Sequence, residues 1–261
     1  MDFKLEGKQV FVSGSTQGIG YAVAATCAAE GAAVVLNGRS SQRVDDAVER
    51  LRASVPGGDI SGIAADFADP QHVRTLLDAL GPVDVLVNNV GLFDVAPFAE
   101  IGDEEWLRYF EVNVMSGVRL SRHVLDAMLA KGWGRIIFIG TESAVDVPSE
   151  MIHYGASKAA ALALSNGLAK LTRGTGVTVN TVLGGPTYSD GVAHTVEQVA
   201  SERSMSPDAL KSALVRESSL IQRFIEPDEI ANLVAYLASP ISSATSGAAL
   251  RADGGVLPTI V

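Results

Sequence analysis

The sequence predicts one α/β domain over residues 1–261, built on a Rossmann-type, doubly wound sheet of seven mostly parallel strands with helices on both faces. Three observations lead to this prediction. Short apolar runs alternate with amphipathic stretches, a glycine-rich turn joins the first run to the first helical pattern, and 261 residues is a usual size for one large α/β unit. Strands buried on both faces read as continuous apolar runs, which is typical of parallel sheets covered by helices.

The expected elements follow one another in regular order. Apolar runs mark the strands, at residues 10–12, 33–36, 60–65, 83–87, 136–139, 177–183 and 248–252. Helical spacing of apolar residues marks the helices between them, at 18–30, 41–53, 70–80, 103–130, 154–174 and 227–238.

The segment 186–227 breaks this alternation with Pro, Gly, Ser and charged residues. It contains two short helical patterns, at about 195–203 and 207–219. Because it follows the sixth strand, at the sheet end where ligands bind in such folds, we expect a substrate lid. The alternative is a structural excursion at a subunit contact.

Composition and charge exclude several classes of function. The formal net charge of −10 argues against nucleic acid and membrane as partners, since both require basic surface, and favours a small-molecule ligand. Cys27 is the only cysteine, and His72, His123 and His194 show no metal-ligand spacing, so no metal site is expected. The first residues lack a signal-peptide core, and no apolar run approaches the about 18 residues of a membrane span. We expect a soluble, cytoplasmic protein.

A glycine-rich turn follows the first expected strand and leads directly into the first helix. It reads Ser13-Gly14-Ser15-Thr16-Gln17-Gly18-Ile19-Gly20. Glycines in this position permit a tight turn, let the backbone approach a pyrophosphate, and leave helix N-terminal amides for phosphate. No Gly-Lys-Ser/Thr follows, which excludes a Walker-type loop. We expect residues 14–20 to bind a dinucleotide, the alternative being an ordinary tight turn.

The tip of the second expected strand indicates which dinucleotide is bound. Sites that prefer NAD place an acidic residue on the ribose 2′-hydroxyl about twenty residues after the glycine turn. Here the stretch 36–40 carries no carboxylate, and Arg39 could instead pair with a 2′-phosphate, with Ser40 as an added donor. The sequence therefore predicts NADP(H) in preference to NAD(H). The alternative is an exposed arginine without a ligand.

Two further strand ends carry residues that could line a cofactor groove. Asp66, with Phe67 beside it, follows the third strand, and its carboxylate could bind an adenine amino group or cap the helix at 70–80. Asn89 and Gly91 follow the fourth strand. An asparagine there either braces neighbouring strands or lines the groove.

A tyrosine and a lysine open the alanine-rich helix at 154–174. Residues four apart share a helix face, so the Tyr154 phenol and the Lys158 ammonium can point into one cleft. A fixed positive charge lowers a phenol pKa from its usual value of about 10, which makes Tyr154 a candidate general acid or base. The alternative is a solvated surface pair. Asn113, inside the pattern 103–130, could distort its helix and hold a water, or lie on an ordinary helix surface.

Together these motifs resemble the short-chain dehydrogenase/reductase family over nearly the whole chain, with the 3-oxoacyl-acyl-carrier-protein reductase and tropinone-reductase-like branches as the most similar. The shared features, in the family's order and spacing, are the glycine turn, Asn88-Asn89-Val90-Gly91, Asn113, Tyr154-x-x-x-Lys158, Gly185-Pro186 and Ala252-Asp253-Gly254-Gly255.

The resemblance implies a nicotinamide cofactor, interconversion of a carbonyl and an alcohol, and a homotetramer, with a homodimer as the alternative. It implies that the loop 184–189, including Gly185, Thr187 and Ser189, holds the nicotinamide. Lys158 would grip the nicotinamide ribose, and Asn113 would hold a water that connects Lys158 to solvent.

The chain departs from the family pattern at four positions. Ser13, Val90 and Gly184 stand where the family usually has Thr, Ala and Pro. The family's catalytic serine, thirteen residues before the tyrosine, falls on Thr141, whose hydroxyl can donate the same hydrogen bond from a stiffer side chain. Ser143 would share a face with Thr141 if the strand continued, so it is the alternative to the favoured Thr141.

The expected substrate pocket is mostly apolar, with Phe93, Val145, His153, Leu183 and Tyr188 in its wall. Two other functions fit the same scaffold. One is a nucleotide-sensing binding protein without turnover, and the other is an epimerase or dehydratase that leaves its cofactor unchanged overall.

Overall fold

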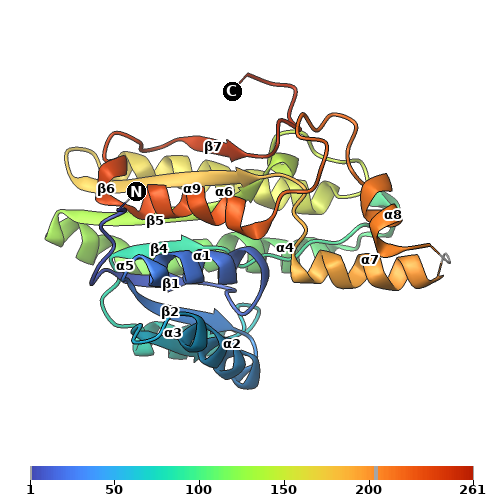
Figure 1. Cartoon of the computed structure of the whole chain (residues 1–261). Helices are drawn as coiled ribbons and strands as arrows, with labels where there is room; N and C mark the ends of the chain where they lie inside the picture. The colour runs from blue at the N-terminus through green and yellow to red at the C-terminus, as the bar shows by residue number, and fades with distance from the viewer. Residues whose placement is uncertain (1, 203–204, 261) are drawn as a thin grey trace.

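The computed structural model describes residues 2–202 and 205–260, without the side chains of residues 194, 195 and 202. The His194 side chain and the end of the pattern 195–203 therefore lie outside the described part. The chain forms one parallel seven-stranded sheet in the order β3-β2-β1-β4-β5-β6-β7, as Figure 1 shows. Its strands are β1 (Gln9–Val12), β2 (Ala33–Gly38), β3 (Ile60–Ala64), β4 (Val85–Asn88), β5 (Trp133–Thr141), β6 (Gly176–Gly184) and β7 (Ala249–Ala252).

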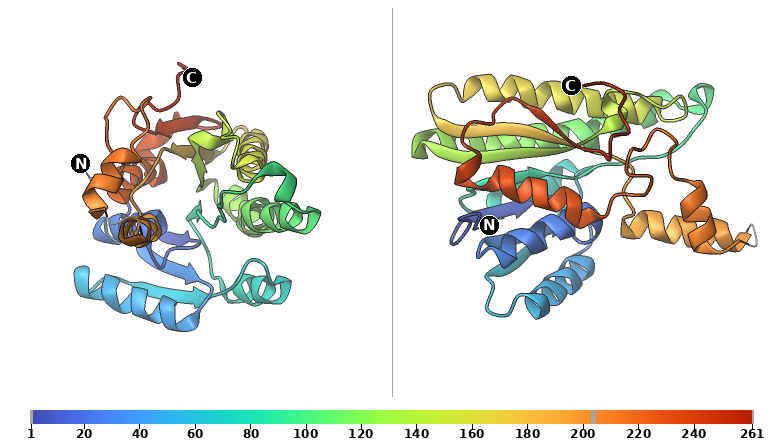
Figure 2. Two further views of the ribbon diagram at one scale, coloured as in Figure 1. Left: turned by 90° about the vertical axis from the view of Figure 1, so that its right-hand side faces the viewer. Right: turned by 45° about the horizontal axis from the view of Figure 1, so that its top comes forward.

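Helices cover both faces of the sheet, so the doubly wound arrangement predicted from the apolar runs is confirmed (Figure 2). One face carries α1 (Gly18–Ala29), α2 (Ser41–Ser54) and α9 (Pro227–Ala238), and the other carries α3 (Pro70–Ala79), α5 (Ser116–Lys131) and α6 (Ile152–Leu171). Successive strand residues enter opposite cores: Val10 and Val12 pack toward α1 and α9, whereas Phe11 packs toward α3 and α5.

Local sequence fixes several helix ends. The Asp69 carboxylate accepts the Gln71 N–H at 2.8 Å and caps α3, with Pro70 as its first residue. Glu226 and Glu229 form a reciprocal capping box at the start of α9. Gly132, at φ +73°, ends α5 in the left-handed conformation that glycine adopts most readily.

The helix expected at 103–130 is interrupted. Its parts are α4 (Asp103–Phe110), a π-helical turn η2 (Glu111–Met115) and α5. A π turn accommodates one extra residue without changing the apolar periodicity much, so the sequence pattern did not reveal it. Asn113 lies inside this turn and is buried, which excludes the ordinary helix surface considered above.

The segment 186–227 projects from the carboxyl ends of the strands and carries α7 (Asp190–Glu202) and α8 (Pro207–Ala213) (Figure 1). These helices pack on each other through Val196, Ala200 and Leu210. The two ends of the segment are joined, because the Tyr188 N–H donates to the Ile225 carbonyl at 2.8 Å. Short 3₁₀ turns complete the described elements, at η1 (Phe98–Glu100), η3 (Glu142–Ala144) and η4 (Pro240–Ser242).

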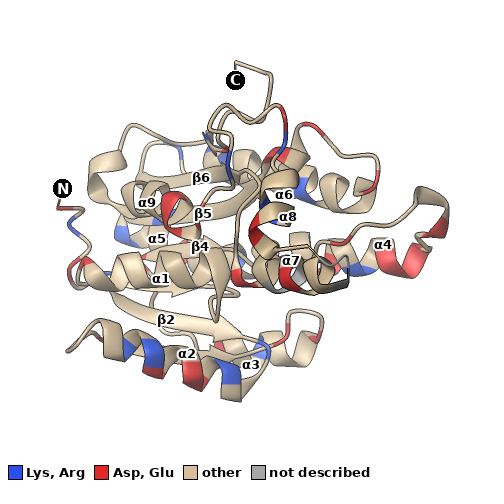
Figure 3. Cartoon of the chain, turned by 45° about the vertical axis from the view of Figure 1, so that its right-hand side comes forward, with Lys and Arg blue, Asp and Glu red and all other residues tan. Residues whose placement is uncertain are grey.

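Acidic side chains are concentrated in the first turn of α4 and also lie along α7 (Figure 3). Among the described helices, none combines the length and apolarity that crossing a membrane requires.

Candidate active site

The candidate site lies at the carboxyl ends of β1, β4, β5 and β6, beside the point where the strand order reverses. β1 is flanked by β2 and β4, so the connections leave it in opposite directions and open a crevice there. The glycine turn follows β1, the stretch 89–91 follows β4, and Thr141 ends β5.

The glycine turn has the conformation that its sequence predicts. Gly14 and Gly18 have φ values of +62° and +59°, which glycine adopts without strain. A Cβ on Gly20 would lie only 2.4 Å from Asn89 Nδ2 and 2.5 Å from the Gly14 carbonyl oxygen. Asn89 Nδ2 donates to the carbonyls of Ser13 and Gly14 at 3.1 and 2.8 Å. Of the two roles considered for Asn89, the structure therefore shows the brace.

Three other residues of the expected cofactor site use their side chains within the fold. The Ser15 hydroxyl donates to the Val12 carbonyl at 2.7 Å and accepts the Asn37 N–H at 2.9 Å, which ties β1 to β2. The Phe67 ring is buried in the core beside α3, so only its backbone can reach a cofactor. Asp66 accepts the Ala68 N–H at 3.0 Å and is not the cap of α3, which is Asp69.

The N-terminus of α1 is suited to an anion. Its N-cap Gln17 makes no side-chain capping bond, and the Gly18 N–H donates to Asp190 Oδ2 at 2.7 Å. A carboxylate from the segment 186–227 thus stands where a pyrophosphate oxygen would bind at a helix N-terminus. Ser189 packs on the same glycine, with its Cβ 3.3 Å from the position of an added Gly18 Cβ. The residues present fit a dinucleotide pyrophosphate.

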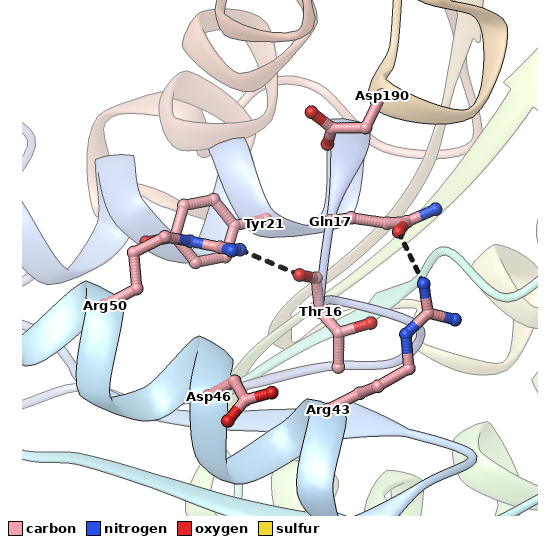
Figure 4. Close-up of a pocket in the computed structure, with 7 residues that line it drawn as sticks. All are labelled: Thr16, Gln17, Tyr21, Arg43, Asp46, Arg50 and Asp190. Atoms are coloured by element: carbon pink, nitrogen blue, oxygen red, sulfur yellow. Dashed lines mark hydrogen bonds between the residues drawn. The ribbon is translucent and has the colours of Figure 1, made fainter. Parts of the chain in front are cut away.

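A cavity of about 400 Å³ lies beside the glycine turn, on its α2 side. Its lining is drawn in Figure 4 and consists of Thr16, Gln17, Tyr21, Arg43, Asp46, Arg50 and Asp190. Arg43 Nη2 donates to Gln17 Oε1 at 3.1 Å, and Arg50 Nη2 donates to the Thr16 carbonyl at 2.8 Å (Figure 4).

Arg39, the expected partner of a 2′-phosphate, is exposed and is not part of this lining. The Ser40 hydroxyl caps α2 by accepting the Arg43 N–H at 3.5 Å. Sequence reasoning missed Arg43 and Arg50, although their spacing of seven places them on one face of the predicted helix.

Tyr154 lies on α6 and is half-buried, with its ring 6.3 Å from that of Phe93. Burial raises the pKa of the Tyr154 phenol, the Thr141 side-chain hydrogen bond lowers it, and the Glu142 charge raises it further. The sequence predicted that Lys158 would lower this pKa. The structure differs, because Lys158 Nζ donates to the Ile139 carbonyl at 3.0 Å and burial dominates the phenol.

Lys158 itself is buried, and burial lowers the pKa of its ammonium to about 8. It lies close to the two other residues named for this part of the site. A Cβ on Gly91 would be 3.1 Å from Lys158 Nζ and 3.6 Å from Asn113 Oδ1. Asn113 Nδ2 donates to Ser157 Oγ at 2.9 Å, and its Oδ1 accepts the Leu92 N–H at 2.6 Å. Asn113 therefore joins the loop after β4 to α6, while its water-holding role stays a prediction.

The two candidate hydroxyls converge on a residue that sequence reasoning did not name. Thr141 Oγ1 donates to Glu142 Oε2 at 2.5 Å, and Ser143 Oγ donates to Glu142 Oε1 at 3.2 Å. Strand β5 ends at Thr141 and Ser143 lies in the 3₁₀ turn η3, so the two do not share a strand face as expected. Thr141 is the one that bonds to Tyr154. The signal for Glu142 was visible in the sequence as a carboxylate between two hydroxyl residues.

The loop after β6 and the expected pocket wall complete the set of site residues named from the sequence. Thr187 Oγ1 donates to the Gly185 carbonyl at 2.8 Å, and a Cβ on Gly185 would lie 2.6 Å from the Asp253 carbonyl oxygen. Phe93 and Val145 are 62% and 46% exposed, and their place in a pocket wall stays a prediction.

Two residues expected in the pocket wall belong to the interior instead. Leu183 is buried, and so is His153, whose ring lies 4.1 Å from that of Tyr109. Tyr188 packs against the apolar cluster of the segment 186–227. In the part of the chain that the structure describes, no three His, Cys, Asp or Glu side chains gather as a metal site.

The glycine turn follows a strand at the switch point, Thr141 ends β5, and Tyr154 and the buried Lys158 lie on α6. This arrangement is typical of α/β oxidoreductases that use a nucleotide cofactor. Comparison with known proteins identifies the family. The family model described as short chain dehydrogenase matches residues 8–200, and the chain belongs to this family.

Relatives agree with this assignment over the whole length. The uncharacterized oxidoreductase YvaG of Bacillus subtilis is 43% identical, with 100% of both chains covered. The 3-oxoacyl-[acyl-carrier-protein] reductase FabG of Escherichia coli is 32% identical over 96% of this chain and 98% of its own. The crystal structure of L-sorbose reductase from Gluconobacter frateurii, complexed with NADPH and L-sorbose, matches with a TM-score of 0.94 at 31% identity and covers 100% of both chains. The chain is thus an oxidoreductase of the 3-oxoacyl-acyl-carrier-protein reductase-like branch.

Proposed function

We propose that the protein interconverts a ketone and a secondary alcohol with NADP(H), and that Tyr154 is the general acid and base. The observation that carries this proposal is the convergence of three groups. The Tyr154 phenol bonds to the Thr141 hydroxyl and lies one helical turn from the buried ammonium of Lys158. The relatives that are reductases, one of them complexed with NADPH, support the same reaction class.

The cofactor site is assigned from the fit of its residues. When bound, the nicotinamide dinucleotide supplies or accepts the hydride. The Gly18 amide binds its pyrophosphate once Asp190 moves aside, and the Lys158 ammonium holds the nicotinamide ribose. Arg39, with Arg43 on the adjoining turn of α2, pairs with a 2′-phosphate, which gives the preference for NADP(H) over NAD(H).

The protein's own groups manage the proton. In the reducing direction, Tyr154 gives its phenol proton to the substrate oxygen, and the Thr141 hydroxyl turns from Glu142 to donate a hydrogen bond to the same oxygen. Burial raises the pKa of Tyr154 and so keeps the phenol protonated at neutral pH, ready to act as an acid. The Lys158 ammonium, with its pKa of about 8, is still charged at neutral pH and is held by the Ile139 carbonyl.

The segment 186–227 is assigned as a lid over the substrate. It projects from the strand ends that carry the site, and its helices pack mainly on each other, so it can move as a unit. Its residue Asp190 contacts the glycine turn, and its residue Arg216 contacts Glu142. Closing such a segment excludes water from the reacting groups.

The test is a substrate screen with both cofactors. Purified protein is mixed with NADPH or NADH and a panel of 3-oxoacyl thioesters, keto sugars and aliphatic ketones, and the nicotinamide absorbance is followed. We expect ketone-dependent oxidation of NADPH. Tight NADPH binding without consumption by any ketone or alcohol would favour the sensor, and conversion of substrate without net cofactor change would favour an epimerase or dehydratase.

We also propose a homotetramer in the cytoplasm. Leu107 and Phe110 on α4 and Leu171 at the end of α6 are exposed apolar side chains, and such side chains are covered when helices pair across subunits. The mass in solution, measured by light scattering, tests the assembly. A monomer at micromolar concentration would contradict it.

A further inference from the structure

A buried carboxylate lies between the two candidate hydroxyls, and the proposed reaction does not account for it. Glu142 is only 3% exposed. Both of its oxygens are engaged, one by Thr141 at 2.5 Å and the other by Ser143 at 3.2 Å. The oxygen that accepts from Ser143 also lies 3.1 Å from Arg216 Nη2.

This arrangement depends on the arginine. A carboxylate removed from water is strongly unfavourable unless a cation and hydrogen-bond donors compensate its charge. The two hydroxyls supply hydrogen bonds but no charge, so Arg216 is the compensating cation. Taking Arg216 away would leave an uncompensated negative charge next to Tyr154.

Arg216 belongs to the segment 186–227, in the stretch between α8 and α9. Its side chain is 37% exposed, whereas that of Glu142 is 5% exposed, so the segment brings a partly solvated cation to a buried anion. A few residues later the Leu220 N–H donates to the Gly254 carbonyl at 2.9 Å and holds this stretch on the sheet end. The ion pair is therefore a contact between the proposed lid and the catalytic strand.

Hydrogen bonds connect this ion pair to the phenol of Tyr154. A hydroxyl has one proton to donate, and Thr141 gives its proton to Glu142. The same hydroxyl hydrogen-bonds to Tyr154, where it lowers the pKa of the phenol, so Glu142 and the phenol oxygen compete for the one Thr141 proton. A change in the position of the lid therefore affects the Tyr154 phenol through Arg216, Glu142 and Thr141 in turn.

We propose that Glu142 is a positioning residue for Thr141 and Ser143, and that its ion pair with Arg216 couples closure of the segment 186–227 to alignment of these hydroxyls. This inference rests on the proposed function, because the hydroxyls matter only if they hold a substrate oxygen. With the segment closed, the Arg216 cation compensates the negative charge of Glu142 and the two hydroxyls are aligned. With the segment open, the unpaired carboxylate withdraws and Thr141 loses its orientation.

A double-mutant cycle tests the coupling. Arg216→Met removes the cation, Glu142→Gln removes the charge that needs it, and the double variant removes both. We expect kcat to fall about tenfold or more in Arg216→Met, with the Kd for NADPH within about twofold of the wild type. Adding Glu142→Gln should lower kcat little further, because the ion pair that the second change would break is already lost. Arg216→Lys, which keeps the charge, should retain most of the activity.

The matched control is Arg223→Met. Arg223 lies in the same segment and pairs with Glu229 at 2.6 Å, but it does not contact the hydroxyls. Its kcat should stay within about twofold of the wild type. If the effects of Arg216→Met and Glu142→Gln simply multiply, or if Arg223→Met is as damaging as Arg216→Met, the coupling is wrong.

Hydrogen exchange of residues 207–219 gives a readout that needs no turnover. Exchange should be faster in both Arg216→Met and Glu142→Gln than in the wild type or Arg223→Met, because each variant releases the segment. Unchanged exchange would overturn the inference even if activity were lost. A wild-type protein that turns over no substrate would refute the proposed function alone, since the exchange experiment would still decide whether Arg216 and Glu142 hold the segment.

Discussion

The site has two halves that are built in different ways. The glycine-turn half comprises residues 13–20 and Asn89, and the tyrosine half comprises Tyr154, Lys158 and their partners. The first is held by backbone groups and short side chains inside the fold, such as Ser15 and Asn89, which bond to carbonyls of β1 and its turn. The second relies on long side chains that meet across elements distant in sequence, namely Lys158, Glu142 and Arg216. The difference indicates that the proposed cofactor site is largely preformed, whereas the proposed catalytic alignment depends on where the segment 186–227 lies. Mutations in one half should therefore leave the function of the other intact.

The largest expected effect is on the tyrosine half alone. Tyr154→Phe removes the phenol proton but keeps the ring, so kcat should fall about 1,000-fold, within the range for loss of a general acid. The Kd for NADPH, measured by fluorescence titration, should stay within about twofold. Substantial turnover by this variant would show that another group delivers the proton.

A pH experiment locates the buried charge in the tyrosine half. The pKa of Lys158 is about 8 in the folded protein, below its ordinary value of 10.5, so between these pH values the unfolded chain binds more protons and stability rises with pH. From pH 7.5 to 10.5 the wild type should gain about 3 kcal/mol in free energy of unfolding relative to Lys158→Met. Urea unfolding of both proteins at each pH measures this. A difference that does not change with pH would contradict the assigned pKa.

A change in the glycine-turn half should lower the affinity for NADPH. Gly20→Ala places a methyl group 2.5 Å from the Gly14 carbonyl oxygen, a backbone atom that cannot move without opening the turn. We expect NADPH affinity to fall about 100-fold, a loss of about 2.7 kcal/mol. Gly167→Ala on α6, where nothing lies within 4 Å of the added carbon, is the control and should bind normally. Normal binding by Gly20→Ala would mean that the turn is not the cradle.

Cofactor choice should respond to charge at the α2 side of the same half. Arg39→Asp should reverse the ratio of kcat/KM for NADPH over NADH, with a change of about tenfold or more, because a carboxylate repels a 2′-phosphate and accepts from a 2′-hydroxyl. Arg43→Ala is the comparison. If Arg43→Ala removes the preference while Arg39→Asp leaves it unchanged, Arg43 is the partner of the phosphate and the sequence prediction for Arg39 is wrong.

The smallest effect concerns the hydrogen bond between Asp190 and the glycine turn. Asp190→Asn removes a negative charge from the Gly18 N–H, the proposed pyrophosphate site. We expect NADPH to bind a few-fold more tightly at low salt, with the gain shrinking as salt is added. Asp208→Asn, at an exposed position in the first turn of α8, should change nothing. Weaker binding by Asp190→Asn would show that the carboxylate helps the cofactor.

Local patterns in the sequence were sufficient to predict the sheet and the conformation of the glycine turn. Continuous apolar runs predict buried strands, and the glycine spacing predicts a turn whose φ values only glycine tolerates well. The sequence did not predict the π turn at 111–115, because one inserted residue barely shifts the helical period of the apolar residues. Phe67 and His153 are buried by side chains from other elements, and a local sequence pattern does not show such partners.

The sequence named Tyr154, Lys158 and Thr141 as candidates for the tyrosine half, but it did not indicate their arrangement. The spacing of Tyr154 and Lys158 places both on one helix face, yet the direction of each pKa shift depends on burial and on Glu142. The partners Glu142 and Arg216 stand far apart in the sequence, and only the fold of the segment 186–227 brings them together. Contacts between long side chains of distant elements cannot be predicted from local sequence patterns.

The most direct measurement of the central claim is a crystal structure with NADP⁺ bound. The nicotinamide ring should lie at the carboxyl end of β5, with its reactive carbon and the Tyr154 hydroxyl separated by on the order of 5 Å, the span of one substrate carbonyl held between them. The pyrophosphate should replace Asp190 at the Gly18 N–H. A nicotinamide bound away from Tyr154, or a dinucleotide that leaves the glycine turn empty, would contradict the account.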